Sequence, residues 1–515
     1  MEREMPSLAE KLKEYAESDV YPYHMPGHKG NADTGSIFDE LHGMDITEIE
    51  GFDDLHHATD ILKRVQEEAA CAFGADRTFY LVGGSTAGIL TAVSAVLEPG
   101  SELLIARNCH KSVYHAAYLR GLKLHYIVPE YDPQGQILKP VTAAQVRKAL
   151  REYPNISAVL ITSPTYEGLV ANVGEIAEAV HEKGIPLIVD EAHGAHFGFA
   201  SCLPSNSNAW ADLVVQSLHK TTKALTQTAL LHVNGNRVSA AQVQKYLDIY
   251  MTSSPSYLLM ASMEEAVKDL LDNGEQLYRD FMQKKESFLK KTAGMKTLFV
   301  YQQMDASENE KKCGNMALCM DADENGKTDK KADPCKILIC SRAREFSGKR
   351  LYDVLLQKYH LQMELCENNH VLAIMTPYDR QEGFDRLAAA LNEIDWELTG
   401  RYRNESCSIG LTGELHTFPP HLPRQAQTLT ESWSEGQIIP ITECAGRISA
   451  AFVYQYPPGI PLVVPGEVWD EELVSEVVEK IATGYEMLGI VEKCGTIKVV
   501  VTENQTVKVK PVTMK

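Results

Sequence analysis

The chain has 515 residues, 44% of them hydrophobic, which suffices for several domains with large cores, and a formal net charge of -20 at pH 7. This charge argues against nucleic acids and anionic membranes as partners, and no stretch approaches the roughly 18 apolar residues of a membrane span. Eleven scattered cysteines without C-x-x-C spacing, and an amino terminus without an apolar signal region, predict a cytoplasmic protein with reduced thiols.

The first 75 residues are predicted to form an N-terminal segment. It opens with an amphipathic helix over residues 8–15, and a second helical pattern starts near residue 60. The loop between them, residues 21–30, contains His24, His28 and Lys29, and the family resemblance described below implies that these residues line the entrance of an active site.

Residues 76–285 are predicted to form a large α/β domain. Apolar, β-branched runs alternate with helical patterns, which favours a mostly parallel seven-stranded sheet with helices on both faces. The strands are expected at residues 79–82, 102–106, 123–128, 158–162, 186–190, 213–217 and 228–232, and two of the helices at 142–153 and 173–183.

The remaining chain is predicted to form two smaller domains. A long helix over 263–292 leads into a small α/β domain, residues 286–398, and a C-terminal α+β domain follows over 399–515. The small domain combines patterns at 336–340, 346–359 and 369–377 with a closing helix at 381–398, and its charged stretch 304–331 is expected to be an exposed insertion. The C-terminal domain is expected to contain an apolar stretch at 439–464 and a helix at 470–488.

Ionisable residues follow two of the predicted strands. Asp190 ends one strand, and the sequence Ser217-x-His219-Lys220 ends the next. Alone, such an Asp is usually a cap and a Lys is usually on the surface. Together they are the groups that hold pyridoxal phosphate (PLP), in which Lys220 forms the Schiff base and Asp190 keeps the pyridine nitrogen protonated.

A glycine turn supports the same interpretation. Gly83 and Gly84 follow the first strand of the large domain, and Ser85 and Thr86 stand at the amino end of the next helix. Backbone N–H groups and hydroxyls in such a turn bind phosphate. The sequence therefore predicts a cofactor-phosphate site here.

Two other interpretations of these motifs are rejected. Residues 190–193 spell the acidic box of some helicases, but the only Gly-Lys-Thr, at 326–328, has Asp321 where a phosphate loop needs glycine. His24 and His28, or His193 and His196, are spaced like metal ligands, but Pro26 and Gly27 argue against a helix for the first pair, and no metal is expected.

The motifs in order resemble the bacterial ornithine/lysine/arginine decarboxylases. The matching residues are 23–30, 83–86, 108–112, 190–193, 217–220, 456–461 and 465–467. The resemblance spans nearly the whole chain and implies fold type I of the PLP enzymes, the aspartate-aminotransferase fold. It also implies the short form of the family, without a receiver-like N-terminal domain.

The resemblance assigns roles to individual residues. Lys220 would hold PLP, Asp190 would pair with the pyridine N–H, His110 would stack on the ring and His193 would approach the ring hydroxyl. The phosphate would be bound by Ser85, Thr86, Ser217 and His219. Cα would be protonated by His219 or Lys220, and the residues leave this choice open.

The implied substrate is a small cationic amino acid. Arginine, giving agmatine, is favoured over lysine and ornithine, in a role in polyamine synthesis or acid tolerance. Glu364 and Glu467 are candidates for reading the side chain, and residues 456–467 form either a packing segment or a wall of the pocket. The fold implies a homodimer or higher homo-oligomer with shared active sites, in which the loop 251–257 reaches a neighbour's cofactor.

Two other functions retain the cofactor motifs or the fold. An aminotransferase or carbon–carbon lyase would keep Lys220 and Asp190, but the motifs at 24–30 and 456–467 argue against it. A non-catalytic regulatory homologue usually loses the Schiff-base lysine, which this chain retains.

Overall fold

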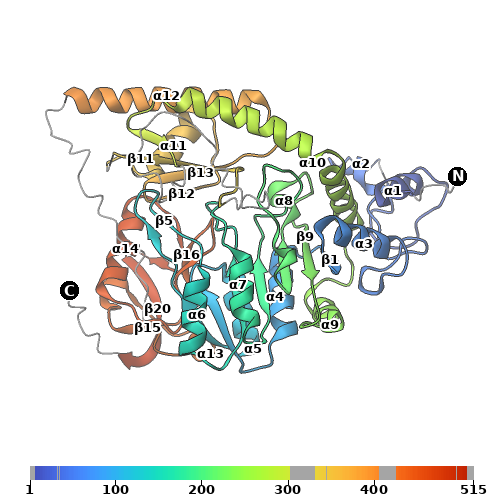
Figure 1. The fold of residues 1–515 in the computed structure, drawn as a ribbon, viewed down its shortest axis with the longest axis horizontal. Coiled ribbons are helices and arrows are strands. Elements are labelled where there is room, and N and C mark those ends of the chain that lie inside the picture. The colour runs from blue at the N-terminus through green and yellow to red at the C-terminus, as the bar shows by residue number, and fades with distance from the viewer. Residues whose placement is uncertain are drawn as a thin grey trace.

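A seven-stranded sheet lies at the centre of the protein (Figure 1). The structure is a computed structural model that describes residues 6–31, 33, 35–301, 331–343, 345–404, 425–493 and 496–506. The strand order is β1-β9-β8-β7-β6-β2-β3, and every neighbouring pair is parallel except the two that involve β9. The strands are β1 (Arg77–Leu81), β2 (Glu102–Ala106), β3 (Lys123–Ile127), β6 (Ile156–Thr162), β7 (Leu187–Asp190), β8 (Leu213–Gln216) and β9 (Ala229–Val233). The predicted sheet is confirmed.

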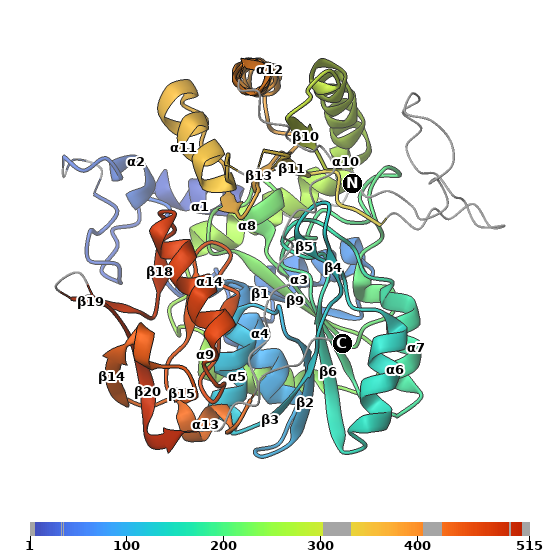
Figure 2. The same ribbon diagram turned by 90° about the vertical axis from the view of Figure 1, so that its left-hand side faces the viewer.

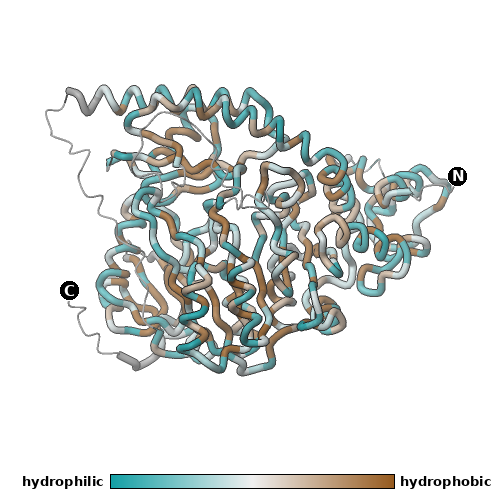
Figure 3. The backbone as a smooth tube through the Cα atoms, viewed as in Figure 1, coloured by the Kyte–Doolittle hydropathy of each residue, from teal (hydrophilic) through white to brown (hydrophobic). Residues whose placement is uncertain are grey.

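Helices cover both faces of this sheet, as Figure 2 shows. Successive residues of a strand face opposite sides, so Leu213 and Val215 join the core under α4 and α5, whereas Val214 joins the core under α6 and α7. This explains why the strands are apolar throughout, as the brown central tube in Figure 3 illustrates. The covering helices are α4 (Gly84–Val96), α5 (Lys111–Arg120), α6 (Ala143–Glu152), α7 (Val173–His181) and α9 (Ala240–Tyr250).

A long helix, α10 (Tyr257–Thr292), connects the large domain to the small one. It begins six residues before the predicted start, because the Ser256 side chain accepts a hydrogen bond from the Leu259 N–H and caps the helix. The N-terminal helices lie beside its first half in Figure 1, where α1 contacts α10. They are α1 (Leu8–Ala16), α2 (Asp39–His42) and α3 (Ile61–Phe73), with the 3₁₀ turn η1 (Leu55–His57).

The small domain is a four-stranded antiparallel sheet, in the order β10-β11-β13-β12, packed against two helices. Its elements are β10 (Leu298–Val300), β11 (Lys336–Ser341), α11 (Gly348–Tyr359), β12 (Leu365–Glu367), β13 (His370–Ile374) and α12 (Gln381–Asn404). Helix α12 extends beyond the predicted end at residue 398. The predicted insertion at 304–331 lies outside the described residues, except for Lys331.

The C-terminal domain contains two small sheets and one longer helix. The predicted helix over 470–488 is too long, because Gly484 adopts a left-handed φ of +90° and Met487–Leu488 forms a strand. Its elements are α13 (Leu429–Ser432), β14 (Gln437–Pro440), η3 (Ile441–Glu443), β15 (Arg447–Ser449), β16 (Val453–Gln455), β17 (Pro461–Val463), α14 (Glu471–Ala482), β18 (Met487–Leu488), β19 (Val491–Lys493) and β20 (Thr496–Thr506).

Three short elements complete the large domain: a hairpin of β4 (Tyr131–Asp132) and β5 (Ile137–Leu138), the 3₁₀ turn η2 (Ser207–Ala209), and α8 (Leu218–Thr221). Helix α8 directly follows β8 and carries Lys220. Among the described helices, none combines the length and apolarity needed to cross a bilayer.

Candidate active site

Asp190 and Lys220 come together at the carboxyl edge of the sheet. Asp190 is the last residue of β7, and Lys220 lies in α8 just after the parallel neighbour β8. Burial raises the pKa of Asp190, and the Lys220 charge opposes that rise. Burial likewise lowers the pKa of Lys220, opposed by Asp190 and Glu364. The two residues therefore lie close enough that the charge of each favours the charged form of the other.

The amino end of α4 lies at the same edge, because β1 runs in the same direction as β7 and β8. Gly84 begins the helix with a φ of +68°. In the first turn that follows, Ser85 is half-buried and Thr86 is exposed. A Cβ at Gly88 would come within 2.8 Å of Val215, so this glycine allows α4 to pack directly on β8.

Two hydroxyls next to Lys220 have no hydrogen-bond partner within the described part of the chain. Ser217 Oγ and Thr221 Oγ1 are buried, and neither finds a donor or acceptor among the described residues. Buried hydroxyls of this kind ordinarily have a partner. Together with the first turn of α4 at the same sheet edge, they are candidates for binding a phosphate. Ser217 is among the phosphate ligands expected from the sequence and remains a prediction, whereas Thr221 is not among them.

His110 forms another wall of the site. It caps the amino end of α5, where its Nδ1 lies 2.9 Å from Ser112 Oγ. Burial, followed by the Lys220 charge, lowers the pKa of His110 to about 3, so the ring is a flat, neutral surface near Lys220. Gly459 of the C-terminal domain lies against this ring, and a Cβ there would come within 3.2 Å of Nε2. Part of the segment 456–467 therefore borders the site.

His193 lies between two lysines. Its Nε2 is 3.1 Å from Lys220 Nζ, and its Nδ1 is 2.7 Å from Lys336 Nζ. Lys336 begins β11 of the small domain and is buried. We did not predict Lys336 as a site residue, although a lysine heading a buried apolar strand is a signal that could have identified it.

His219 is held by the backbone. Its Nδ1 lies 2.8 Å from the Thr228 carbonyl oxygen, which can only accept, so this nitrogen carries the proton. Burial lowers the pKa of His219, with Thr228 opposing and Lys220 adding to the shift. As a neutral ring, His219 presents Nε2 only as an acceptor, so donation to a phosphate or to Cα requires the imidazolium.

The two residues predicted to bind the substrate side chain, Glu364 and Glu467, lie in different environments. Glu364 accepts a hydrogen bond from the Tyr166 hydroxyl and is close enough to Lys220 and Lys336 to influence both pKa values. Glu467 is buried, and both of its carboxylate oxygens accept hydrogen bonds from Arg107. Glu364 therefore lies beside the two lysines of the site, whereas Glu467 belongs to a buried ion pair with Arg107.

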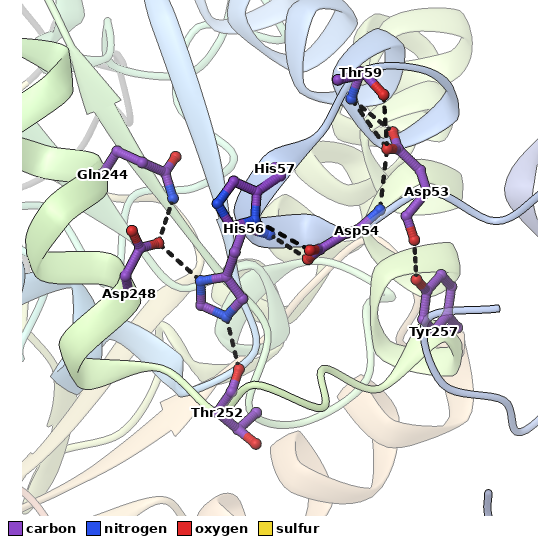
Figure 4. A network of polar contacts seen from close by, with 9 residues as sticks. All are labelled: Asp53, Asp54, His56, His57, Thr59, Gln244, Asp248, Thr252 and Tyr257. Carbon is purple, nitrogen blue, oxygen red and sulfur yellow. Dashed lines mark hydrogen bonds and ion pairs between the residues drawn. The ribbon is translucent and has the colours of Figure 1, made fainter. Parts of the chain in front are cut away.

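The loop at 251–257 is tied to the N-terminal segment, as Figure 4 shows. His56 Nδ1 lies 2.9 Å from Asp248 Oδ1 and His56 Nε2 lies 2.8 Å from the Thr252 carbonyl oxygen, while the Tyr257 hydroxyl donates to the Asp53 carbonyl. Because both ring nitrogens of His56 face acceptors, the protonated ring fits this network best.

In each histidine pair considered as metal ligands, the two rings contact different partners. His24 Nε2 lies 2.6 Å from the Tyr15 hydroxyl, and His28 Nε2 lies 3.2 Å from Asp45. His193 contacts the two lysines. His196 Nε2 instead lies 2.9 Å from Asp333 Oδ1, in a buried cluster that also contains Cys335. This contact connects the loop after β7 to the small domain.

Comparison with known proteins shows which family the chain matches. The family profile "Orn/Lys/Arg decarboxylase, major domain" matches residues 6–383, and the profile "Orn/Lys/Arg decarboxylase, C-terminal domain" matches residues 419–481. The chain is 32% identical over 486 residues to an arginine decarboxylase of Bacillus subtilis (strain 168), covering 93% of this chain and 94% of the relative. An arginine decarboxylase of Bacillus cereus is 33% identical, covering 88% and 95%.

Among solved structures, lysine decarboxylase A from Pseudomonas aeruginosa superposes with a TM-score of 0.78 at 18% identity, covering 97% of this chain and 80% of that one. This likeness, together with the sheet order, confirms the predicted fold type I architecture.

Proposed function

The chain belongs to the Orn/Lys/Arg decarboxylase family, and from that premise we propose that it is a PLP-dependent arginine decarboxylase, which forms agmatine and CO₂. The observation that carries the proposal is the meeting of Asp190 and Lys220 at the ends of adjacent parallel strands. Lysine and ornithine are the next candidate substrates.

The residues present fit PLP. Ser217 Oγ and Thr221 Oγ1 lack partners in the described part of the chain, and the first turn of α4 lies at the same sheet edge. These groups would hold the phosphate. Lys220 would carry the aldehyde carbon, Asp190 the pyridinium N–H, and His110 would stack on the ring. When bound, PLP supplies an electron sink for the pair of electrons left at Cα as CO₂ departs.

The chain's own residues prepare this chemistry. The lowered pKa of Lys220 favours the free amine, which is the nucleophilic form. Asp190 supplies a negative charge that would stabilise a protonated pyridine nitrogen. Gly459 lies against the His110 ring, and its carbonyl accepts a hydrogen bond from the Lys111 N–H, so the C-terminal domain helps to exclude water from that side.

Glu364 is the proposed reader of the substrate side chain. It is half-buried, held by the Tyr166 hydroxyl, and near the charge of Lys220. A carboxylate accepts the two parallel N–H groups of a guanidinium particularly well. The names of the Bacillus relatives, which cover nearly the whole chain, also favour arginine.

Each turnover replaces the departing carboxylate with a proton at Cα. The N–H of His219 donates to the Thr228 carbonyl and is not available to Cα. Lys220, which would be released from the cofactor when the substrate binds, would lie next to Cα and could donate a proton from its ammonium form. Lys220 is therefore our proposed donor.

We further propose that the protein works as a homodimer or higher homo-oligomer. In support, large apolar side chains of the N-terminal segment are exposed, with Tyr23 at 88% and Ile37 at 92%. Contiguous exposed apolar residues often mark an interface. A second copy would cover them and bring the loop 251–257 towards a neighbouring site.

The test is release of amine from arginine, lysine and ornithine, measured side by side with added PLP. Agmatine formed by the wild-type protein, and absent with Lys220→Ala, is the expected result. Cadaverine or putrescine in its place would reassign the substrate. A keto acid with no amine would identify an aminotransferase, and failure to take up PLP would overturn the proposal.

A further inference from the structure

We propose that Lys336, acting through His193, is a positioning residue that sets the protonation state of Lys220 and refills it with a proton in each cycle. The inference rests on the proposed function only in the role of Lys220. The hydrogen-bonded chain of the three side chains stands on its own geometry.

The three groups form a continuous row. Lys220 Nζ, His193 Nε2, His193 Nδ1 and Lys336 Nζ follow one another at 3.1 Å and 2.7 Å across the ring. His193 and Lys336 are both buried, at 6% and 7% exposure. Tyr166 lies edge-on to His193 at 4.5 Å and beneath Lys336 Nζ at 5.2 Å, which shields the row from solvent.

When the row carries one ammonium, hydrogen-bond stoichiometry allows it two states. Burial, followed by the charges of Lys220 and Lys336, keeps the pKa of His193 well below its usual value, so the ring is neutral with one N–H. When Lys336 is an ammonium, it donates to Nδ1, and Nε2–H donates to the lone pair of a neutral Lys220. When Lys220 is the ammonium, the pattern is reversed.

Exchange between the two states moves one proton without charging the ring. Lys336 gives a proton to Nδ1 while Nε2 gives its proton to Lys220, so the total proton count of the row is unchanged. One amine is charged in each state, which avoids two adjacent buried cations. This exchange delivers the proton of Lys336 to Lys220, which then protonates the product carbon. Both amines are neutral after that step, and the row takes up from water the one proton that each decarboxylation consumes.

We take Lys336 as the resting cation, because three carboxylates stabilise its charge. Asp333, Glu364 and Glu167 all stabilise its charge, while the charge of Lys220 opposes it. Burial nevertheless dominates and lowers the pKa of Lys336 to about 8. Lys220 faces Asp190 and Glu364. A group with a pKa near the working pH can both hold and release a proton.

The position of Lys336 suits a relay rather than a second Schiff base. The aliphatic part of Lys336 packs against Gly168, since a Cβ at that glycine would come within 2.5 Å of Lys336 Cγ. Gly168 also has a φ of +97°, which favours glycine at this position. The backbone around it is anchored as well, because the Asp333 N–H donates to the Gly168 carbonyl at 2.8 Å. The amine is therefore held at His193 from a different domain.

The first test uses cofactor-free protein and measures the reaction of Lys220 with acetic anhydride against pH, by mass spectrometry. Lys336→Met removes the resting cation, so Lys220 takes the proton itself, and we expect its labelling at pH 7.5 to fall about tenfold. Lys336→Arg keeps the cation and should label like the wild type. Lys285→Met is the control, since Lys285 is a half-buried lysine that donates to the Pro334 carbonyl and not to His193. Unchanged labelling in folded Lys336→Met would overturn the coupling.

The second test uses the PLP-loaded enzyme and separates a relay from a fixed charge. An arginine side chain does not release its proton, so Lys336→Arg should lower kcat about tenfold or more, with little change in KM, and should remove the limb of the pH profile due to Lys336. A wild-type kcat and pH profile in Lys336→Arg would reduce Lys336 to a structural charge. If wild-type protein releases no amine but the labelling result holds, the proposed function fails and the coupling stands.

Discussion

Arg107 and Glu467, 360 positions apart in the sequence, form a buried ion pair in which Arg107 Nε and Nη2 donate to the two carboxylate oxygens at 3.0 and 2.9 Å. Arg107 Nη1 also donates to the Pro461 carbonyl at 2.8 Å. Burial lowers the pKa of Arg107, but the Glu467 charge more than offsets this and raises it above its usual value. The pair joins the C-terminal domain to the edge of the sheet that carries the site.

We predict that Glu467→Gln strongly destabilises the protein, because it leaves the Arg107 charge buried without a counter-charge. The expected loss is about 3 kcal/mol in the free energy of unfolding, measured by denaturant titration. The matched control is Glu17→Gln, which breaks a surface pair with Lys13 whose side chains are 69% and 71% exposed, and should cost less than about 0.5 kcal/mol. Equal effects of the two changes would contradict the prediction.

Replacement of Asp190 by Asn is expected to lower kcat by about 10²- to 10³-fold, because a neutral amide cannot stabilise a charged ring nitrogen. Amine release gives the rate, and the absorbance of bound cofactor shows whether PLP is retained. The neighbouring Glu191 is the control. Burial raises the pKa of Glu191 to about 8, so it is mostly uncharged at pH 7, and Glu191→Gln should keep most of the activity. An Asp190→Asn enzyme within threefold of wild type would refute the assignment.

Glu364→Gln is expected to raise KM for the cationic substrate about 10- to 100-fold with a smaller effect on kcat, because it removes a charge-assisted hydrogen bond worth about 1.5–3 kcal/mol. The measurement is steady-state amine release. Binding of norleucine, which has an uncharged side chain of similar length, should be nearly unaffected. A parallel loss of norleucine binding would show that Glu364 shapes the pocket instead of reading charge.

The His56 network in Figure 4 predicts a pH-dependent loop. Burial lowers the pKa of His56, but the Thr252 carbonyl and the Asp248 carboxylate together raise it above the usual value. The stabilisation is therefore complete below about pH 6.5, the pKa of an unfolded histidine, and is lost as the pH rises through the higher folded value.

Hydrogen exchange of residues 251–256 should accordingly be faster at pH 8.5 than at pH 6, beyond the intrinsic chemical dependence. His56→Gln should abolish this difference. The adjacent His57, whose side chain is 80% exposed and pairs with Asp54 three positions earlier, offers a control, and His57→Gln should leave the difference intact. A difference that persists in His56→Gln would exclude His56 as its origin.

Self-association through the N-terminal segment is testable by sedimentation. Ile37→Asp combined with Phe38→Asp places charges on two exposed apolar residues, and we expect the dimer dissociation constant to rise at least about tenfold. Ile249→Asp, at a side chain that is 60% exposed on α9, is the control. Unchanged association in the double variant would place the interface elsewhere.

The sequence by itself determined the central sheet and the position of its chemistry. Apolar runs of strand length that end in Asp190 and Lys220 imply buried parallel strands, and parallel strands bring their carboxyl ends to one edge. Local patterns also predicted the glycine turn before Ser85. They failed at the ends of two helices, where the Ser256 cap and the turn at Gly484 decide the boundary.

Only the tertiary structure decided which residues of the other domains enter the site. Lys336 and Glu364 come from the small domain, and Gly459 comes from the C-terminal domain, more than 100 positions beyond Lys220. Their placement depends on how domains pack, and packing between domains leaves no periodic signal in a local sequence. The same packing separated Glu364, which faces the two lysines, from Glu467, which faces Arg107.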